Sequence, residues 1–163
     1  MMNNIDPSNT YLFSDPHFDH TNIIKYCSRP FMSTEEMNTT MLNNYNSIVK
    51  NDSLVFFLGD MAFGRGSRKP RWWLNQLNGD IIYFKGSHDE GITSRSTGLN
   101  ALEVIDSKVI RVSGLDIALV HNPANIQHEG WIIHGHTHNS LGMKIFNFEK
   151  KQVNISADVT GFK

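Results

Sequence analysis

The sequence predicts an α/β fold, in which helices cover sheets built from short apolar strands. Runs of large apolar residues recur along the chain, and each stops at a turn signal such as Gly, Asp-Pro or Asn-Pro, which is typical of buried strands. Segments in which apolar residues recur at helical spacing separate several of these runs. The chain has 163 residues, and this length favours a single domain over residues 1–163.

Strands and helices alternate in the first half of the chain. Ser33 and Glu36 form a capping box, and apolar residues then recur at helical spacing up to Val49, so a helix should cover the sheet here. The other helices are expected between residues 20 and 30 and from residue 71 onward, and the strands are expected at 11–13, 54–58 and 81–84.

The second half is expected to contain mainly strands. The polar segment 91–103 should form an exposed loop with a short helix. Residues 109–112 and 115–120 are separated by a Ser-Gly turn and predict a β-hairpin. A further apolar strand is expected at 131–133, and residues 143–148 and 153–155 predict a closing hairpin.

Composition and charge narrow the functional class. Hydrophobic residues make up 39% of the chain and charged residues 19%, which is ordinary for a soluble globular protein. The net charge of −1 gives no overall attraction to nucleic acid or anionic membranes, so any affinity for phosphate must be local. The single cysteine, Cys27, cannot form an internal disulfide, and the chain shows neither a signal-peptide pattern nor a membrane-spanning run, so we expect a cytoplasmic protein.

The segment 61–70 is basic and precedes two adjacent tryptophans. Arg65, Arg68 and Lys69 lie in it, and Trp72 and Trp73 follow. One interpretation is a solvated basic loop with the tryptophans packed inward, and the other is a surface that attracts phosphates. We favour the first, because the glycines at 64 and 66 are too weak a signal for a phosphate-binding loop.

Side chains that bind metals follow five of the predicted strands. If these strands are neighbours that run in the same direction, their carboxyl ends meet at one edge, where open α/β sheets place their sites. Residues two apart on an extended segment point the same way, so each pair separated by one residue should be delivered side by side. The groups are Asp15 and His17; Asp60; Ser87 and His88; His121; and His136 and His138.

This mixture of carboxylates and imidazoles suits manganese, iron or zinc better than magnesium or calcium. The candidate ligands are too many for one ion, so two ions that share a bridging carboxylate fit better. Two-metal sites hold their ions about 3.5–4 Å apart and clamp the attacking and leaving oxygens of a phosphoryl transfer. The residues alone therefore indicate a two-metal site for phosphoryl chemistry.

As a set, these motifs resemble those of the calcineurin-like metallophosphoesterases. The resemblance runs in order over residues 11 to 138, through Asp15-x-His17, Gly59-Asp60, Gly86-Ser-His-Asp89, Val120-His121 and Gly135-His-Thr-His138. The first motif continues as in a small microbial subgroup of that superfamily, with His20, Asn22-Ile-Ile24 and Arg29-Pro-Phe31.

The resemblance implies a four-layer α/β/β/α sandwich of two mixed β-sheets flanked by helices, with a dinuclear centre at the strand ends. It implies two metal sites that share Asp60 as a bridging ligand. The first site would be Asp15, His17 and His138, and the second Ser87, His121 and His136. Ser87 departs from the family pattern, which usually has Asn here, so we expect a weaker or water-completed second site.

The activity implied is hydrolysis of phosphodiester or phosphomonoester bonds through a metal-bridging hydroxide. His88 would protonate the leaving oxygen, and Asp89 is a candidate for orienting its imidazole. The subgroup resemblance also implies substrate contacts by His20 and Arg29, although each is open to a capping or surface role. Asp158 could orient a ligand histidine.

We expect two divalent metal ions, manganese first, with iron, zinc or nickel as alternatives. The expected partner is a phosphate-ester substrate, with a nucleotide as one candidate, and no obligate nucleic acid or membrane. The sequence leaves the oligomeric state open. Two alternatives stay open: a nuclease of the same superfamily, against which the modest basic content argues, and a non-catalytic binding module, to which Ser87 gives some weight. His134 and His128 are expected to play no part in the site.

Overall fold

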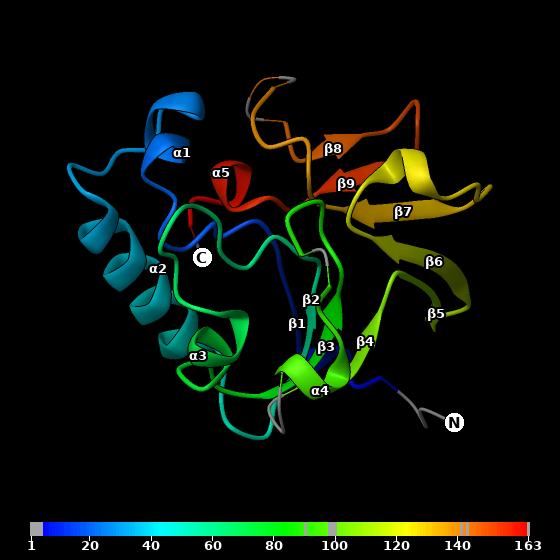
Figure 1. Cartoon of the computed structure of the whole chain (residues 1–163). Coiled ribbons are helices and arrows are strands. Elements are labelled where there is room, and N and C mark those ends of the chain that lie inside the picture. The colour runs from blue at the N-terminus through cyan, green and yellow to red at the C-terminus, as the bar shows by residue number, and fades with distance from the viewer. Residues whose placement is uncertain (1–4, 90, 98–100, 141, 143, 163) are drawn as a thin grey trace.

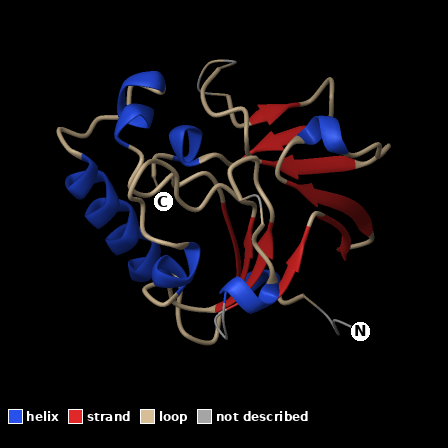
Figure 2. Ribbon diagram, viewed as in Figure 1, coloured by secondary structure: helices blue, strands red, loops and turns tan. Residues whose placement is uncertain are grey.

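The computed structural model describes residues 5–89, 91–97, 101–140, 142 and 144–162. Two β-sheets lie one against the other, and most of the helices lie on one side of the first sheet (Figures 1 and 2). The predicted α/β class with two sheets is confirmed.

The first sheet contains four strands in the order β1-β2-β3-β4. All three pairings are parallel, so the sheet is not mixed as expected. The carboxyl ends of β1, β2 and β3 therefore meet at one edge. The strands are β1 (Thr10–Phe13), β2 (Leu54–Phe57), β3 (Asp80–Phe84) and β4 (Ala101–Ile105).

The second sheet contains five strands in the order β5-β6-β7-β9-β8 and is mixed. β6, β7 and β9 are parallel, whereas β5 and β8 pair antiparallel at the two edges. The carboxyl ends of β6 and β7 lie side by side as a result. The strands are β5 (Ser107–Val112), β6 (Leu115–Val120), β7 (Trp131–His134), β8 (Phe146–Asn147) and β9 (Gln152–Asn154).

Helices α1, α2 and α3 lie together on one side of the first sheet (Figure 1). Ser33 caps α2 as predicted, since its hydroxyl accepts from Glu36 N. Among the described residues, no helix is long and apolar enough to cross a membrane. The helices are α1 (Thr21–Tyr26), α2 (Thr34–Ile48), α3 (Pro70–Leu74), α4 (Ser94–Thr97) and α5 (Ala157–Thr160), with 3₁₀ turns η1 (Pro7–Asn9) and η3 (Pro123–Asn125).

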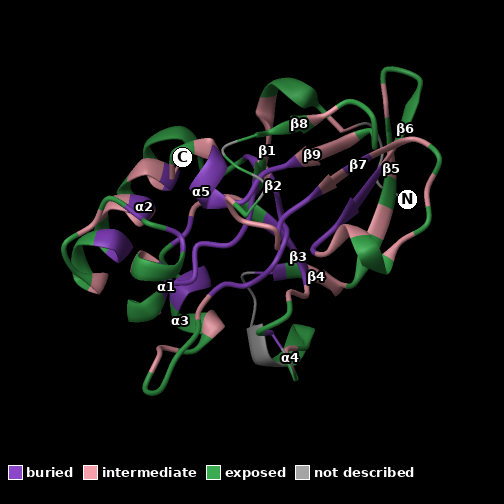
Figure 3. Ribbon diagram, turned by 90° about the horizontal axis from the view of Figure 1, so that it is seen from above, coloured by how far each residue is buried: buried purple, intermediate pink, exposed green. Residues whose placement is uncertain are grey.

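The core is split by the first sheet, because alternate side chains of its strands point to opposite faces. Phe57 and Tyr83 pack with the helices, in the cluster that includes Met37 and Met41 of α2. Phe56, Leu58, Ile82 and Phe84 face the second sheet and pack with Leu119 and Ile155. Figure 3 shows these buried segments along the centre of the molecule. Both central strands are thus buried on two faces, which explains their uninterrupted apolar runs.

Two expectations require correction or restriction. The segment 91–103 was expected to be a loop with a short helix, and α4 fits that, but Ala101 begins strand β4. Glu103 interrupts the apolar residues of this edge strand, so it lacks an apolar run. Residue Met143, the expected start of the closing hairpin, lies outside the described residues. On the outer face of the second sheet, Ile126 beside the 3₁₀ turn η3 packs against Ala118, Val120 and Ile132.

Candidate metal centre

The five strand ends come from two sheets, which meet at one edge. Ser14 forms an isolated parallel bridge with Ser156, and this joins the end of β1 to the segment after β9. The Asp15 carboxylate also accepts from the backbone N–H of His136, at 3.0 and 3.1 Å, so the loop after β1 is tied to the loop after β7. Groups 121 residues apart in the chain are thereby brought together.

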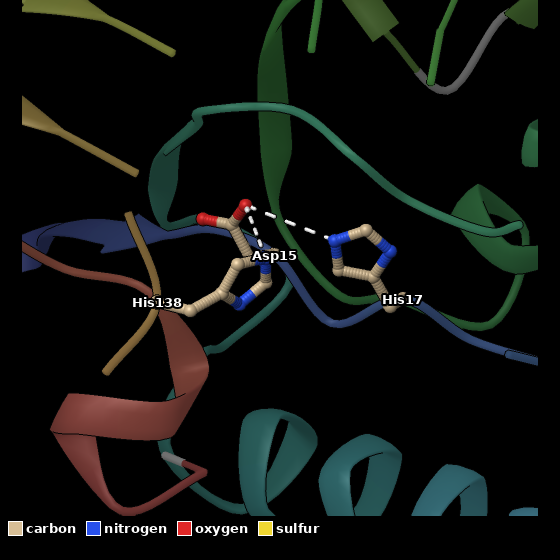
Figure 4. A group of neighbouring side chains, drawn as sticks. All are labelled: Asp15, His17 and His138. Carbon is tan, nitrogen blue, oxygen red and sulfur yellow. Dashed lines mark ion pairs between the residues drawn. The ribbon is translucent and has the colours of Figure 1, made fainter. Parts of the chain in front are cut away.

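Asp15, His17 and His138 form one group of neighbouring side chains (Figure 4). Asp15 Oδ1 lies 4.0 Å from His17 Nε2 and 3.9 Å from His138 Nε2. Asp15 and His17 are buried and His138 is partly buried. These spacings leave room between the three atoms for a cation, with one carboxylate oxygen and two imidazole nitrogens as donors.

Asp60 stands between this group and a second one. Its Oδ2 lies 3.4 Å from His17 Nε2 and 3.4 Å from His121 Nε2. Its Oδ1 accepts from the backbone N–H of His88 at 2.8 Å, which fixes the carboxylate plane. Asp15, Asp60 and His121 also offer ligand atoms within 4.8 Å of one another.

His136 lies beside His121, and Ser87 lies beside His136. The rings of His121 and His136 are 5.1 Å apart, and Ser87 Oγ lies 3.2 Å from His136 Nδ1. His136 and His138 therefore face different neighbours, although the alternation of an extended strand predicted that they lie side by side. The reason is the backbone, because the chain is no longer extended after His134.

Five of the candidate ligands have left-handed backbone conformations. Their φ angles lie between +47° and +66°, a region that costs a non-glycine residue about 1–3 kcal/mol. With such turns after a strand, the side chains no longer follow the alternation of an extended segment. The conformation occurs at Asp15, His17, Asp60, His136 and His138. Nothing in the sequence near these residues signals it.

Two glycines allow the loops to approach each other this closely. A Cβ atom on Gly135 would collide with Ser14 Oγ and Asp15 Oδ2, and one on Gly86 would collide with Asp60 Oδ1. Both glycines immediately precede candidate ligands in the chain. Glycine is needed here because of the packing of neighbouring loops.

The unpaired buried atoms at this centre fit a metal. Neither ring nitrogen of His17 has a hydrogen-bond partner, and His121 Nε2 has none either. His121 Nδ1 lies 2.7 Å from Leu58 O and donates to it, so Nε2 is the ring nitrogen that faces Asp60. A buried imidazole without partners is costly unless something coordinates it. The donor set is that of a borderline divalent metal ion.

The electrostatics of the histidines agree with this geometry. Burial lowers the pKa of His17 to about 2, so it is neutral and its lone pair is available. Burial alone would lower the pKa of His121, but the Asp60 carboxylate 3.4 Å from its Nε2 and the charge of Asp15 outweigh this and raise the pKa to about 9. The same carboxylates that attract a proton here would attract a divalent cation.

Asp158 supports the first group from outside it. Its Oδ2 accepts from His138 Nδ1 at 2.6 Å, which confirms the expected contact with a candidate ligand histidine. Arg29 donates to the other face of the same carboxylate, with Nε 2.8 Å from Oδ1. Arg29 is only 4% exposed and also donates to the carbonyls of Asp15 and Pro16. The expected contact of Arg29 with substrate phosphate is therefore wrong, because its guanidinium is used inside the protein.

Asp89 is also placed differently from the expectation. Its Oδ2 accepts from the backbone N–H groups of Asp60 and Gly86, at 2.7 and 2.9 Å, and its Oδ1 has no hydrogen-bond partner. The carboxylate thus holds the loop of Asp60 and does not orient the His88 imidazole. His88 is exposed, with its ring 5.4 Å from that of His17.

The remaining histidines lie at three different places. His20 lies beside the centre, with its ring 5.5 Å from that of His17, so a substrate contact remains a prediction. His134 is buried and its Nδ1 lies 2.8 Å from Gly135 O. His128 Nε2 lies 3.1 Å from Asp116 O, on the surface. Neither His134 nor His128 belongs to a ligand group among the described residues.

Comparison with known proteins gives one relative of high similarity. No protein-family model matches the chain. The uncharacterized protein MJ1445 of Methanocaldococcus jannaschii is 41% identical over 160 residues, which cover 94% of this chain and 84% of that protein.

Two solved structures are more distant. The protein of unknown function AQ665 from Aquifex aeolicus aligns with a TM-score of 0.72 and 24% identity, over 94% of this chain and 92% of that one, which shows a common fold. An archaeal phosphodiesterase aligns with a TM-score of 0.46 and 17% identity, over 93% of this chain and 87% of that one, a similarity too low to assign an activity. Because 41% of the residues are identical over most of both sequences, the chain belongs to the same family as the uncharacterized protein MJ1445 of Methanocaldococcus jannaschii.

Proposed function

We propose that this chain is a dinuclear-metal-dependent phosphoesterase of the calcineurin-like superfamily, with residues 1–163 as one domain. The position of Asp60 carries the proposal, because its Oδ2 is 3.4 Å from a nitrogen of His17 and 3.4 Å from one of His121. Two ions that share one bridging ligand need a carboxylate in such a place. The ordered motifs from Asp15 to His138 support the same assignment.

The residues present fit two ions of the manganese, iron, zinc or nickel type, and we expect manganese. Asp15, His17 and His138 would hold the first, and Ser87, His121 and His136 the second, with Asp60 shared. When bound, such ions supply hydroxide at neutral pH and neutralise charge on the phosphoryl oxygens. The substrate would be a phosphodiester or a phosphomonoester.

His88 is the proposed proton donor to the leaving oxygen. Its ring is exposed beside the centre, while its backbone N–H is bound to Asp60 Oδ1, so the imidazole is held near the reacting atoms but is free to meet the substrate. General acids of this kind contribute about 10²–10⁴-fold. His20, whose ring also lies near that of His17, is proposed to contact the substrate phosphate.

Two buried carboxylates act through other residues. Asp158 fixes the ring of His138 through Nδ1, which leaves Nε2 to face Asp15. Asp89 binds the backbone of Asp60 and Gly86 and so keeps the Asp60 carboxylate between the two histidines. Both are positioning residues, and their loss should weaken metal binding.

The test combines metal analysis with hydrolysis. Chelator-treated protein is reloaded with manganese, its metal content is measured by mass spectrometry, and turnover of bis-p-nitrophenyl phosphate, p-nitrophenyl phosphate and a DNA oligomer is recorded. We expect up to two bound ions and metal-dependent turnover of a small ester. Asp60→Asn should lower turnover at least 100-fold, whereas Asp52→Asn, on the exposed turn before β2, should leave it unchanged.

Other outcomes separate the alternatives. Cleavage of the DNA oligomer without turnover of the small esters would favour a nuclease. Stable metal binding without any turnover would favour a non-catalytic binding module. A protein that retains no transition metal after loading would overturn the proposal as a whole.

A further inference from the structure

A cavity of about 670 Å³ opens beside the centre, on the side of His88. His88 and His20 line it together with residues of the segment that connects β2 with α3. Ligand pockets in proteins have volumes of about 300–1,000 Å³, so the cavity is large enough for a group well beyond a single phosphate. Because His88 is the proposed donor to the leaving oxygen, this cavity lies where the leaving group would extend.

Phe63 forms an aromatic surface in this cavity. Its ring centroid is 4.0 Å from that of His88 and 4.9 Å from that of His20, yet the residue remains 39% exposed. Its backbone is tied to the segment after β1, because Phe63 N donates to Phe18 O. A ring that is fixed in place and exposed on one side offers a planar ligand a stacking partner.

Arg68 anchors the basic segment to the rest of the fold. Its guanidinium pairs with Asp19 at 2.6 Å and lies 4.4 Å from the rings of both Trp72 and Trp73. Trp73 is buried, as the solvated-loop interpretation expected, whereas Trp72 is 41% exposed. The segment is thus tied to the segment after β1 at Phe63 and at Arg68, on both sides of Arg65.

Arg65 and Lys69 are the other cations of the basic segment, and both line the cavity. Both are exposed, and no ion pair or side-chain hydrogen bond joins either of them to a described residue. In a chain of net charge −1, two uncompensated cations in the lining of a cavity are a local attraction for an anion. Arginine and lysine bind phosphate well.

We propose that this cavity binds the leaving group of the substrate, and that this group carries a planar ring and a further phosphate. The ring would lie on Phe63 and the phosphate between Arg65 and Lys69. A nucleoside 3′-phosphate esterified through its 5′-oxygen has this chemistry, so the substrate class is an oligonucleotide-like phosphodiester. Hydrolysis breaks the bond from phosphorus to the 5′-oxygen, places the hydroxyl of water on phosphorus, and returns a proton to the 5′-oxygen from His88. This inference rests on the proposed phosphoesterase function.

The test compares the dinucleotide dTpdA with its 3′-phosphorylated form dTpdAp. For the manganese-loaded protein we expect kcat/KM to be about tenfold higher for dTpdAp. The double variant Arg65→Gln with Lys69→Gln should bring this ratio close to one, because the terminal phosphate has lost its partners. Lys150→Gln, an exposed lysine in the turn between β8 and β9, is the matched control and should keep the ratio.

A second comparison tests the ring. Phe63→Leu keeps apolar bulk but removes the aromatic face, so it should lower about tenfold the preference for dTpdA over the methyl ester of thymidine 3′-phosphate. Each ratio is taken within one variant, so a change in the active fraction of protein cancels. Equal ratios for the wild type and these variants would overturn the inference.

The two proposals can fail separately. Turnover of bis-p-nitrophenyl phosphate without any advantage of dTpdAp would reject the cavity assignment and leave the phosphoesterase standing. If no ester is hydrolysed, calorimetry with deoxyadenosine 3′-phosphate decides, with inorganic phosphate present to occupy the centre. Binding that weakens about tenfold in the double variant would support the cavity assignment, and the absence of binding would overturn it.

Discussion

Asp158 Oδ2 lies 2.6 Å from His138 Nδ1, and this contact connects the last helix to the candidate ligand loop after β7. On its other side Asp158 pairs with Arg29, which in turn donates to the backbone of Asp15. The first group of ligands is therefore supported by a buried chain of charged hydrogen bonds that begins at a residue outside the family motifs.

Asp158→Asn should weaken metal binding about 10–100-fold, since the partner that fixes a ligand histidine is lost. Affinity is measured by competition with a chelator, at a temperature at which circular dichroism shows the variant folded. In the background of His138→Ala the same change should have no further effect on affinity. An equal loss in both backgrounds would show that Asp158 acts on stability and not through His138.

Asp158 also predicts how stability depends on pH in the metal-free protein. Burial raises its pKa, but hydrogen bonds from His138 and Arg29 outweigh this and lower the pKa from 3.8 to about 2. The ionised Asp158 carboxylate, bound to His138 and Arg29, therefore stabilises the fold above pH 3.8. This contribution is lost as the pH falls toward 2. The lowering corresponds to about 2 kcal/mol. Urea unfolding of chelator-treated protein between pH 5 and pH 2 measures it. The Asp158→Asn variant should lose less stability than the wild type between pH 5 and pH 2. An identical loss in both proteins would show that Asp158 does not cause this pH dependence.

His88→Ala should lower turnover about 10²–10⁴-fold while the bound metal stays. The backbone N–H that holds Asp60 Oδ1 is kept in this variant, so the ligand groups should remain in place. Kinetics and metal content are measured on the same preparation, with the surface variant His128→Ala as control. If metal is lost instead, His88 is a ligand, which its place beside His17 and Asp60 would allow.

Much of the fold could be predicted because its central strands are buried on two faces and therefore read as apolar runs. Leu54–Phe57 and Asp80–Phe84 are such strands. β4 could not be found in this way, because it lies at an edge and Glu103 interrupts its apolar residues. The candidate ligands could be found from their place after the strands, but the left-handed turns at these residues arise from the packing of two loops, which a local pattern does not record.

The supporting residues were harder to assign than the ligands. Arg29 and Asp89 lie within or beside the motifs, so they were expected to meet substrate or the proton donor. The partner of Arg29 is Asp158, 129 residues away, and the partners of Asp89 are backbone N–H groups. A motif identifies the residue types around a site, whereas only the tertiary fold decides which of them face inward.

Ser87→Asn should strengthen the second metal site. Ser87 is exposed, and its Oγ lies 3.2 Å from His136 Nδ1. The calcineurin-like metallophosphoesterases, which the motifs resemble, usually have an asparagine at this position. The serine side chain is shorter, so its oxygen has less reach toward an ion held by His121 and His136. We expect the wild type to bind its second ion at least tenfold more weakly than the first, and Ser87→Asn to reduce this difference and raise turnover.

Ser87→Ala tells whether the serine hydroxyl takes part at all. If the hydroxyl is too short to reach, its removal leaves the affinity for the second ion unchanged, whereas a direct ligand would cost affinity when removed. Titration calorimetry with manganese on the three proteins distinguishes these cases. If Ser87→Asn changes neither the metal stoichiometry nor the turnover, residue 87 does not limit the second site, and the difference between the two ions must arise from His121 and His136.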